Sequence, residues 1–394
     1  MLSNRQLFLS NTAQTSASPR LIEIERAEGV YLYGPNGERY LDLVSGFAVS
    51  NIGHRHPRVL EAITTQLDRF LHVTVYGEFV QAPQVALATQ LLAVLPDRFN
   101  SVYFTNSGTE ATEGAMKIAK KFTGRRQIIA AEKAYHGSTQ GALSLIGNPE
   151  YHRAYAPLLP DIEFIRYNEP GHIGKITTAT AAVILEAVQG EAGIRVPDIS
   201  YMQAIRKRCD ETGTLLIFDE IQTGFGRTGE LFAFQHYGIE PDILLLAKGM
   251  GGGMPIGAFV ANKAVMDVIK DNPMLGHITT FGGHPVSCAA ALASLNVILN
   301  EQLMADVGRK SQLFRHHLQH PAIREIRGVG LMLCIQLDTF EQVESVSKYC
   351  AENGVIIDWF LHCTTALRVS PPLIISDDDI AMACSVILNG LDRL

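Results

Sequence analysis

The feature that most constrains the fold is a series of seven short apolar segments between residues 101 and 260, separated by stretches with helical spacing. Most of these segments are apolar at successive positions, which is typical of strands buried on both faces. Apolar strands that alternate with helices predict a mainly parallel sheet covered by helices, an α/β architecture. The expected strands are residues 101–105, 127–131, 162–165, 181–186, 214–219, 242–247 and 257–260.

The flanking parts of the chain have a different character. Residues 30–33 and 38–43 alternate around Pro35-Asn36-Gly37, which predicts a hairpin. Helical spacing follows at residues 57–71 and 82–95. Beyond about residue 290, the expected elements of a smaller α+β unit are residues 323–337, 343–353, 355–357, 366–369 and 377–391.

A chain of 394 residues is long enough for two domains. We expect residues 46–290 to form a large domain and residues 291–394 to form a small one. Residues 1–45 are expected to be an N-terminal segment that contributes to the small domain.

Charge, cysteine usage and apolar run lengths exclude several classes of protein. The net charge is -7 and no block is rich in Lys and Arg, so no nucleic-acid partner is expected. Six cysteines without a CxxC pair indicate neither a zinc ribbon nor a disulfide framework, and they suit the cytoplasm. No apolar run reaches the roughly 18 residues that a membrane span needs. His54 and His56 are expected to form a structural turn, and His316, His317 and His320 are expected to lie on a solvated helix face, so no metal site is predicted.

Asp219 ends one of the apolar strands, where such sheets bind their ligands. An ionised carboxylate there needs a cationic partner, and a protonated pyridine nitrogen is one that also makes a cofactor ring an electron sink. A helix-capping role is the alternative for an isolated acid. The next strand favours the first interpretation, because it ends at Lys248.

Lys248 joins an apolar strand to the glycine-rich segment 249–253. Partial burial lowers the pKa of an amine and makes it nucleophilic toward an aldehyde, as a Schiff-base lysine requires. The glycines do not form a phosphate-binding P-loop, because in that motif the lysine follows the glycines. The sequence therefore indicates covalent cofactor chemistry at Lys248 rather than ATP hydrolysis.

A phosphate site is predicted where the strand 101–105 leads into a helix at residues 110–121. Ser107, Gly108 and Thr109 lie at that junction and offer backbone N–H groups and two hydroxyls. A helix N-terminus of this kind binds a phosphate through hydrogen bonds and the helix dipole. An ordinary N-cap is the alternative.

Six ordered motifs resemble those of the class III aminotransferases, which include ornithine, acetylornithine, putrescine and 4-aminobutyrate transaminases. The motifs are SGTEA at 107–111, AYHG at 134–137, EAVQGEAG at 186–193, FDEIQTGFGRTG at 218–229, LAKGMGGGMPIGA at 246–258 and TTFGGHP at 279–285. The resemblance covers about residues 29–372. It implies the PLP-dependent transferase fold of type I, with a mainly parallel seven-stranded sheet in the large domain and a smaller α+β domain. It also implies pyridoxal 5'-phosphate (PLP) as cofactor and a homodimer with shared active sites.

The resemblance assigns cofactor contacts to matching residues. Lys248 carries the cofactor as a Schiff base and shuttles the proton, Asp219 pairs with the pyridine nitrogen, and Gln222 binds the ring hydroxyl. Tyr135 stacks on the ring, an arrangement that needs an aromatic plane. The phosphate is held by Ser107, Gly108 and Thr109 together with Thr280 of the partner subunit. His136 and Glu186 complete the expected cofactor site.

Arg368 matches the family arginine that binds the α-carboxylate of an oxo acid, and Glu191 matches the glutamate that pairs with it when an ω-amine is bound. Ser138 stands where acetylornithine and ornithine enzymes have an arginine for the donor's own α-carboxylate. Phe47 replaces a tyrosine of ornithine enzymes. Tyr76 and Glu78 are expected near the entrance, where they offer an aromatic wall and a carboxylate for a distal ammonium; a solvated side chain is the alternative for Glu78.

These features predict a transaminase that moves a terminal amino group from a diamine or ω-amino acid to 2-oxoglutarate or pyruvate. An enzyme of the acetylornithine or ornithine type is one alternative. A racemase, aminomutase or decarboxylase of the same family is another. A PLP-binding or structural protein without catalysis is the third, and the presence of Lys248, Asp219 and Gln222 disfavours it.

Overall fold

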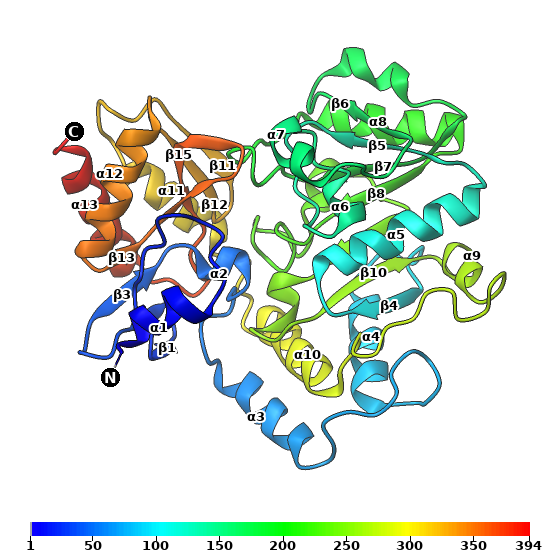
Figure 1. Cartoon of the computed structure of the whole chain (residues 1–394), viewed down its shortest axis with the longest axis horizontal. Coiled ribbons are helices and arrows are strands. Elements are labelled where there is room, and N and C mark those ends of the chain that lie inside the picture. Colours follow the sequence, from blue (N-terminus) through cyan, green and yellow to red (C-terminus); the bar gives the residue numbers. More distant parts are fainter. Residues whose placement is uncertain (1) are drawn as a thin grey trace.

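The computed structural model describes residues 2–394, and its largest element is a seven-stranded sheet (Figure 1). The strand order is β4-β10-β9-β8-β7-β5-β6, and only β10 runs antiparallel to its neighbours. The predicted mainly parallel sheet is therefore confirmed. Its strands are β4 (Ser101–Thr105), β5 (Gln127–Ala131), β6 (Ile162–Ile165), β7 (Thr180–Glu186), β8 (Leu215–Asp219), β9 (Ile243–Leu246) and β10 (Gly257–Ala261).

Both faces of the central strands are buried, which explains why those strands are apolar at successive positions. On one face Ile217 and Leu245 pack against α5 (Gly108–Thr123). On the other face Phe218 and Leu244 belong to a core shared with α4, α8 and α10. Alternate residues of one strand thus serve two helical layers.

The helices of the larger part are short or medium in length. They are α2 (Ser45–Ala48), α3 (Pro57–Leu67), α4 (Ala82–Ala93), α6 (Gln140–Leu143), α7 (Pro149–His152), α8 (Ile199–Thr212), α9 (Lys263–Met266) and α10 (Pro285–Asn300). The predicted helix at 57–71 ends earlier than expected, at Leu67.

The smaller domain joins the two ends of the chain (Figure 1). One sheet has the order β1-β2-β3-β13, in which β3 pairs in parallel with β13, and the other has the order β11-β12-β15-β14. The strands are β1 (Arg26–Glu28), β2 (Tyr31–Tyr33), β3 (Arg39–Asp42), β11 (Glu325–Val329), β12 (Met332–Gln336), β13 (Val355–Ile356), β14 (Asp358–Phe360) and β15 (Cys363–Val369). The predicted N-terminal hairpin is present as β2 and β3.

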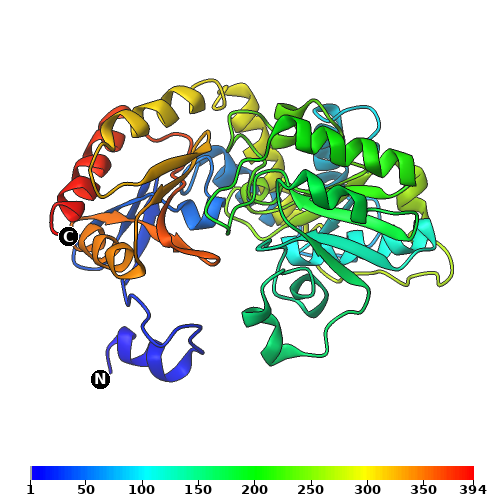
Figure 2. The ribbon, with the colours of Figure 1, turned by 90° about the horizontal axis from the view of Figure 1, so that it is seen from above.

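Three helices cover these sheets, and a fourth stands apart from them. The covering helices are α11 (Val307–His317), α12 (Phe340–Glu352) and α13 (Asp377–Leu391). The remaining helix, α1 (Asn4–Asn11), has no buried residue and lies on an arm that projects from the domain (Figure 2). The larger core extends to Ile298 and the smaller core resumes at Val307, while the boundaries at residues 45 and 290 stay predictions.

Candidate active site

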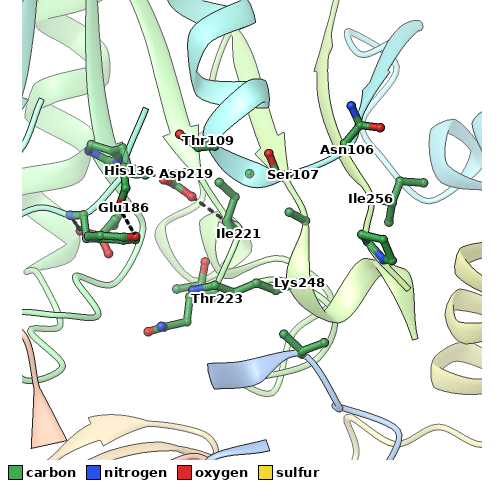
Figure 3. A pocket seen from close by; sticks show the side chains of 18 of the residues that line it. Asn106, Ser107, Thr109, His136, Glu186, Asp219, Ile221, Thr223, Lys248 and Ile256 are labelled. Atoms are coloured by element: carbon green, nitrogen blue, oxygen red, sulfur yellow. Dashed lines mark hydrogen bonds and ion pairs between the residues drawn. The ribbon is translucent and has the colours of Figure 1, made fainter. Parts of the chain in front are cut away.

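A cavity of about 530 Å³ lies beyond the carboxyl ends of β7, β8 and β9, where sheets of this kind bind ligands (Figure 3). Its volume is in the range of small-molecule sites. It brings together residues predicted from well-separated motifs: Ser107, Gly108, Thr109, Tyr135, His136, Ser138, Glu186, Glu191, Asp219, Gln222 and Lys248. The sequence-predicted cofactor residues thus share one space, apart from Thr280.

Asp219 and Glu186 are the last residues of adjacent strands and face each other in register. The carboxylate of Asp219 is almost fully buried. Its Oδ2 lies 2.7 Å from Nδ1 of His136, and its Oδ1 accepts a hydrogen bond of 2.9 Å from Ile221 N. Burial by itself lowers the pKa of His136, but the hydrogen bond and charge of Asp219 outweigh it and raise this pKa. His136 therefore lines the cavity and also binds the carboxylate of Asp219.

Glu186 connects the cavity to the loop that follows β7. Its carboxylate accepts hydrogen bonds from Gly190 N at 3.0 Å and Tyr135 N at 3.4 Å. Burial raises the pKa of Glu186 to about 7, the charge of His136 opposes that shift, and the charge of Asp219 adds to it. Glu186 consequently accepts hydrogen bonds from the backbone on two sides of the site, and its carboxylate interacts electrostatically with His136.

Lys248 follows β9 and points its side chain into the cavity (Figure 3). Its φ of +46° is unfavourable for a residue with a side chain, and such strain is concentrated at functional sites. Burial lowers the pKa of the Lys248 ammonium, and the charge of Glu191 is the main opposing influence. Within residues 2–394 no hydrogen bond or salt bridge restrains this ammonium. The lysine is therefore held by its backbone while its amine stays available.

The residues predicted to bind an anion lie at the junction of β4 and α5. Ser107 is the N-cap of the sixteen-residue helix α5, and its side chain accepts from Glu110 N. A Cβ on Gly108 would lie 2.7 Å from Cδ1 of Ile221, so a larger residue does not fit at that position without displacing Ile221. The hydroxyl of Thr109 is 2.7 Å from that of Thr139. The helix N-terminus thus opens into the same cavity as Lys248.

Arg368 lies next to the cavity and is paired with Glu191, which lines it. The Nη2 atom of Arg368 donates to both carboxylate oxygens of Glu191 at 2.7 Å. Burial alone raises the pKa of Glu191, but the charge and hydrogen bonds of Arg368 exceed that effect and lower it. Leu361 N adds a hydrogen bond of 3.1 Å to the carboxylate. The guanidinium carbon lies 4.5 Å from the ring centre of Phe360 and 5.1 Å from that of Phe47.

The single chain does not bring the other predicted residues into the cavity. Thr280 and Glu78 are exposed, and Phe47 contacts Arg368 instead of the cavity wall. Tyr76 lines a separate cavity of about 490 Å³. Ser138 does line the main cavity, where its hydroxyl is 3.0 Å from that of Tyr135.

Sequence reasoning missed several residues of the cavity wall. Ile221, Val188 and Asn106 line it, each inside or beside a motif that had been recognised. The pattern offered one signal, because Ile221 alternates with polar neighbours after the end of a strand. Position 190 leaves no room for a side chain, since a Cβ on Gly190 would lie 2.2 Å from Oε1 of Gln222.

Across residues 2–394, no group of three or more His, Cys, Asp or Glu side chains is arranged to hold a metal ion. His54 instead pairs with Asp42 at 2.9 Å, and His320 pairs with Asp392 at 3.2 Å. Over the same residues no helix combines the length and apolar character that crossing a membrane requires.

Comparisons with known proteins agree with this geometry. The family model "Aminotransferase class-III" matches residues 12–391. Acetylornithine aminotransferase of Archaeoglobus fulgidus is 40% identical over 370 residues, covering 93% of this chain and 95% of the relative. Putrescine aminotransferase of Pectobacterium atrosepticum is also 40% identical, over 385 residues, covering 92% and 81%. The structure of ornithine aminotransferase from Toxoplasma gondii ME49 superposes with a TM-score of 0.92 at 30% identity, covering 100% of this chain and 96% of that one. This chain belongs to the class III aminotransferases.

Proposed function

We propose that this transaminase moves a terminal amino group from a diamine or ω-amino acid to 2-oxoglutarate or pyruvate. The observation that carries the proposal is the buried ion pair between Arg368 and Glu191 at the edge of the cavity that contains Lys248. A pair that can open presents a cation to an oxo acid, and a closed pair presents no net charge to an amine that lacks an α-carboxylate.

The cofactor of the family is PLP, and the cavity contains the groups that PLP needs. Oε1 of Gln222 and Nε2 of His136 are buried without a partner in residues 2–394, which leaves polar atoms for a ligand to satisfy. Asp219 suits a protonated pyridine nitrogen, Lys248 suits covalent attachment, and the N-terminus of α5 suits a phosphate. Tyr135 and Ile221 supply apolar surface for a flat ring.

Each residue has a defined task in this proposal. PLP, when bound, supplies a reactive carbonyl and a ring that accepts electrons from the substrate carbon. The Nζ atom of Lys248 removes the proton from the carbon that carries the amine and returns it to the cofactor side, which its lowered pKa favours. Asp219 would pair with a protonated ring nitrogen, and His136 orients the Asp219 carboxylate through its contact of 2.7 Å with Oδ2.

Arg368→Ala is expected to weaken the oxo-acid half-reaction far more than the amine half-reaction. Only the acceptor carries an α-carboxylate where the amino group is transferred, and a charge-assisted bidentate contact contributes roughly 2 to 4 kcal/mol. We expect kcat/KM for 2-oxoglutarate to fall by about 30-fold to 1,000-fold. Rapid-mixing spectroscopy of the two half-reactions, followed separately, measures both effects.

Glu191→Gln is the matched variant for that experiment. It removes the partner that neutralises Arg368 during the amine half-reaction and leaves the guanidinium for the oxo acid. Its effect should therefore be larger on the amine half-reaction than on the oxo-acid half-reaction. Equal losses in both half-reactions for both variants would remove the support for a switching ion pair.

The relatives leave two donor classes open, because they include both acetylornithine and putrescine aminotransferases. The position of Ser138 favours the diamine. Its side chain faces the cavity and contacts Tyr135 through a hydroxyl, which carries no charge to pair with a donor carboxylate. A donor with a carboxylate at that end would lose hydration without gaining a cation, at a cost of several kcal/mol.

We expect a higher kcat/KM for putrescine or cadaverine than for acetylornithine or ornithine. Ser138→Arg should shift the ratio toward the amino acids by at least about tenfold, the effect of roughly 1.4 kcal/mol. Ser138→Gln serves as a control of similar length without charge. Steady-state kinetics with the four donors at one concentration of 2-oxoglutarate provide the comparison. Acetylornithine as the best donor of the unmodified enzyme would mean that another cation binds its carboxylate.

The proposal includes a homodimer with active sites at the interface. Apolar side chains are exposed over 71–80 and 274–281, among them Val80 at 94% and Met274 at 76%. Such patches are characteristic of protein interfaces. Thr280, Tyr76 and Glu78 belong to these segments, so a second copy would bring them to a site that one chain leaves incomplete.

A cytoplasmic location is part of the proposal, supported by six unpaired cysteines, five of them buried.

A further inference from the structure

The segment before the cavity contains a left-handed helical turn. Four successive residues, Ser45 to Ala48, have φ values of +48°, +61°, +61° and +64°. Only Gly46 adopts this conformation freely, because in the other three the Cβ approaches the following carbonyl oxygen. Such a turn persists only where surrounding contacts hold it. The turn places the ring of Phe47 over the guanidinium of Arg368, at 5.1 Å.

Arg227 lies at the base of this turn. It is 0% exposed, and its Nη2 donates to Oδ1 of Asn51 at 2.5 Å and to Oγ of Ser45 at 3.3 Å. Its Nη1 donates to Leu331 O at 3.0 Å and to Pro371 O. Burial lowers the pKa of Arg227, and no salt bridge compensates its charge within residues 2–394. A buried cation held by uncharged oxygen atoms is costly to keep unless its geometry is needed.

The partners of Arg227 lead to Arg368 by two routes. Leu331 directly precedes β12, in which Cys334 pairs with Arg368 of β15, and Pro371 follows Arg368 by three residues. The second route runs through Ser45, whose Oγ donates to Ser370 O at 2.6 Å. Arg227 therefore contacts residues adjacent to β15, which carries Arg368, and to β12, which pairs with β15.

Arg227 also connects to the cofactor side of the cavity. It belongs to the same loop as Gln222 and Thr223, which line the cavity. Asn51, its hydrogen-bond partner, donates to Phe225 O at 3.0 Å. A Cβ on Gly249, the residue after Lys248, would lie 2.6 Å from Nδ2 of Asn51. One guanidinium thus connects the loops of Gln222 and Lys248 to the segments adjacent to β12 and β15.

We propose that Arg227 is a positioning residue, which fixes Arg368 and the turn of Phe47 relative to the cofactor loops and so sets the affinity for the oxo-acid carboxylate. This inference rests on the proposed function, in which Arg368 binds that carboxylate. The planar fork of an arginine serves four acceptors in fixed directions, whereas a lysine ammonium keeps the charge without those directions. The substitution that tests the proposal is therefore Arg227→Lys.

The test compares holoenzymes by calorimetric titration with glutarate, a dicarboxylate that cannot be transaminated, and by steady-state kinetics with 2-oxoglutarate. For Arg227→Lys we expect at least a tenfold weaker glutarate affinity and a tenfold higher KM for 2-oxoglutarate, with kcat within threefold. The amine half-reaction should be unchanged. Arg206→Lys is the matched control, since Arg206 is largely buried, pairs with Asp210 and Asp242 and does not line the cavity. It should lower the melting temperature without changing glutarate affinity.

Ser45→Ala provides a second variant if Arg227→Lys fails to fold. It removes the hydroxyl between Arg227 and Ser370 and keeps the buried charge. We expect it to weaken glutarate binding threefold to tenfold. Unchanged glutarate affinity and KM in Arg227→Lys, or in Ser45→Ala where that variant decides, would overturn the proposal.

Arg368→Ala, measured alongside, distinguishes this failure from a failure of the proposed function. If Arg368→Ala weakens glutarate binding but Arg227→Lys does not, only the positioning role is wrong. If Arg368→Ala leaves glutarate affinity unchanged, the carboxylate role of Arg368 is wrong. In that case a loss of glutarate affinity in Arg227→Lys does not act through Arg368, and the positioning role is contradicted as well.

Discussion

Lys248→Ala is expected to lower kcat by at least about 10,000-fold, which corresponds to roughly 5 kcal/mol of transition-state stabilisation. The variant loses both the amine that attaches the cofactor and the base that moves the substrate proton. The fold should be retained, because the Lys248 ammonium forms no hydrogen bond or salt bridge in residues 2–394. Turnover is measured with the best amino donor and saturating 2-oxoglutarate.

Covalent attachment gives a second measurement for the same variant. After borohydride reduction and denaturation, the unmodified protein should retain the cofactor on the peptide that contains Lys248, and the variant should retain none. Lys270→Ala is a suitable control, since the Lys270 side chain is 59% exposed and pairs only with Asp267 among the described residues. A Lys248→Ala protein that turns over at a tenth of the normal rate would contradict the assignment.

Asp219→Asn is expected to lower kcat by about 100-fold to 1,000-fold, or roughly 2.7 to 4 kcal/mol. An amide has nearly the shape of the carboxylate but no charge, so it cannot keep a pyridine nitrogen protonated. The same change should lower the pKa of His136, because the hydrogen bond and charge of Asp219 are the main influences that raise it. His136 would then lose its proton at a lower pH than it does beside the carboxylate.

The neighbouring acid provides a close control for that result. Glu220 is buried beside Asp219, but it accepts hydrogen bonds from Ala233 N and Phe234 N and does not line the cavity. Glu220→Gln should reduce stability and leave kcat within tenfold. Equal kinetic losses in the two variants, or a loss below tenfold in Asp219→Asn, would show that Asp219 is not the partner of the cofactor ring. The kinetics are measured at saturating PLP to separate catalysis from cofactor affinity.

The sheet was predictable because its central strands are buried on both faces and are therefore mostly apolar at successive positions. All seven strands appear within one residue of the expected bounds. The proximity of Asp219 and Lys248 was predictable for a related reason, since Asp219 ends β8 and Lys248 follows the end of the neighbouring strand β9, so the two meet at one edge of the sheet. The local sequence therefore predicted both the strands and the placement of these two residues at one edge of the sheet.

Contacts that depend on tertiary packing were not predictable. The pairing of His136 with Asp219 joins a loop to the end of β8, 83 residues further along the chain, and nothing in either motif specifies it. Likewise, the segment FGRTG at 225–229 is typical of a turn. Only the fold shows that its Arg227 is buried between the larger and the smaller part of the protein. The end of α3 at Leu67 was also missed. Phe70 and Leu71 continue the apolar spacing of the helix in the sequence, but the chain leaves the helical conformation before them.

The parallel pairing of β3 with β13 has a consequence for the order in which the protein folds. Leu41 is the register partner of Val355, so the N-terminal hairpin acquires its last neighbour only when nearly the whole chain has been synthesised. The seven-stranded sheet, complete by Ala261, can form first during translation. Until β13 arrives, β3 has an unpaired edge that is open to association with other chains. Chains that terminate before Val355 should therefore aggregate even though their larger sheet is complete.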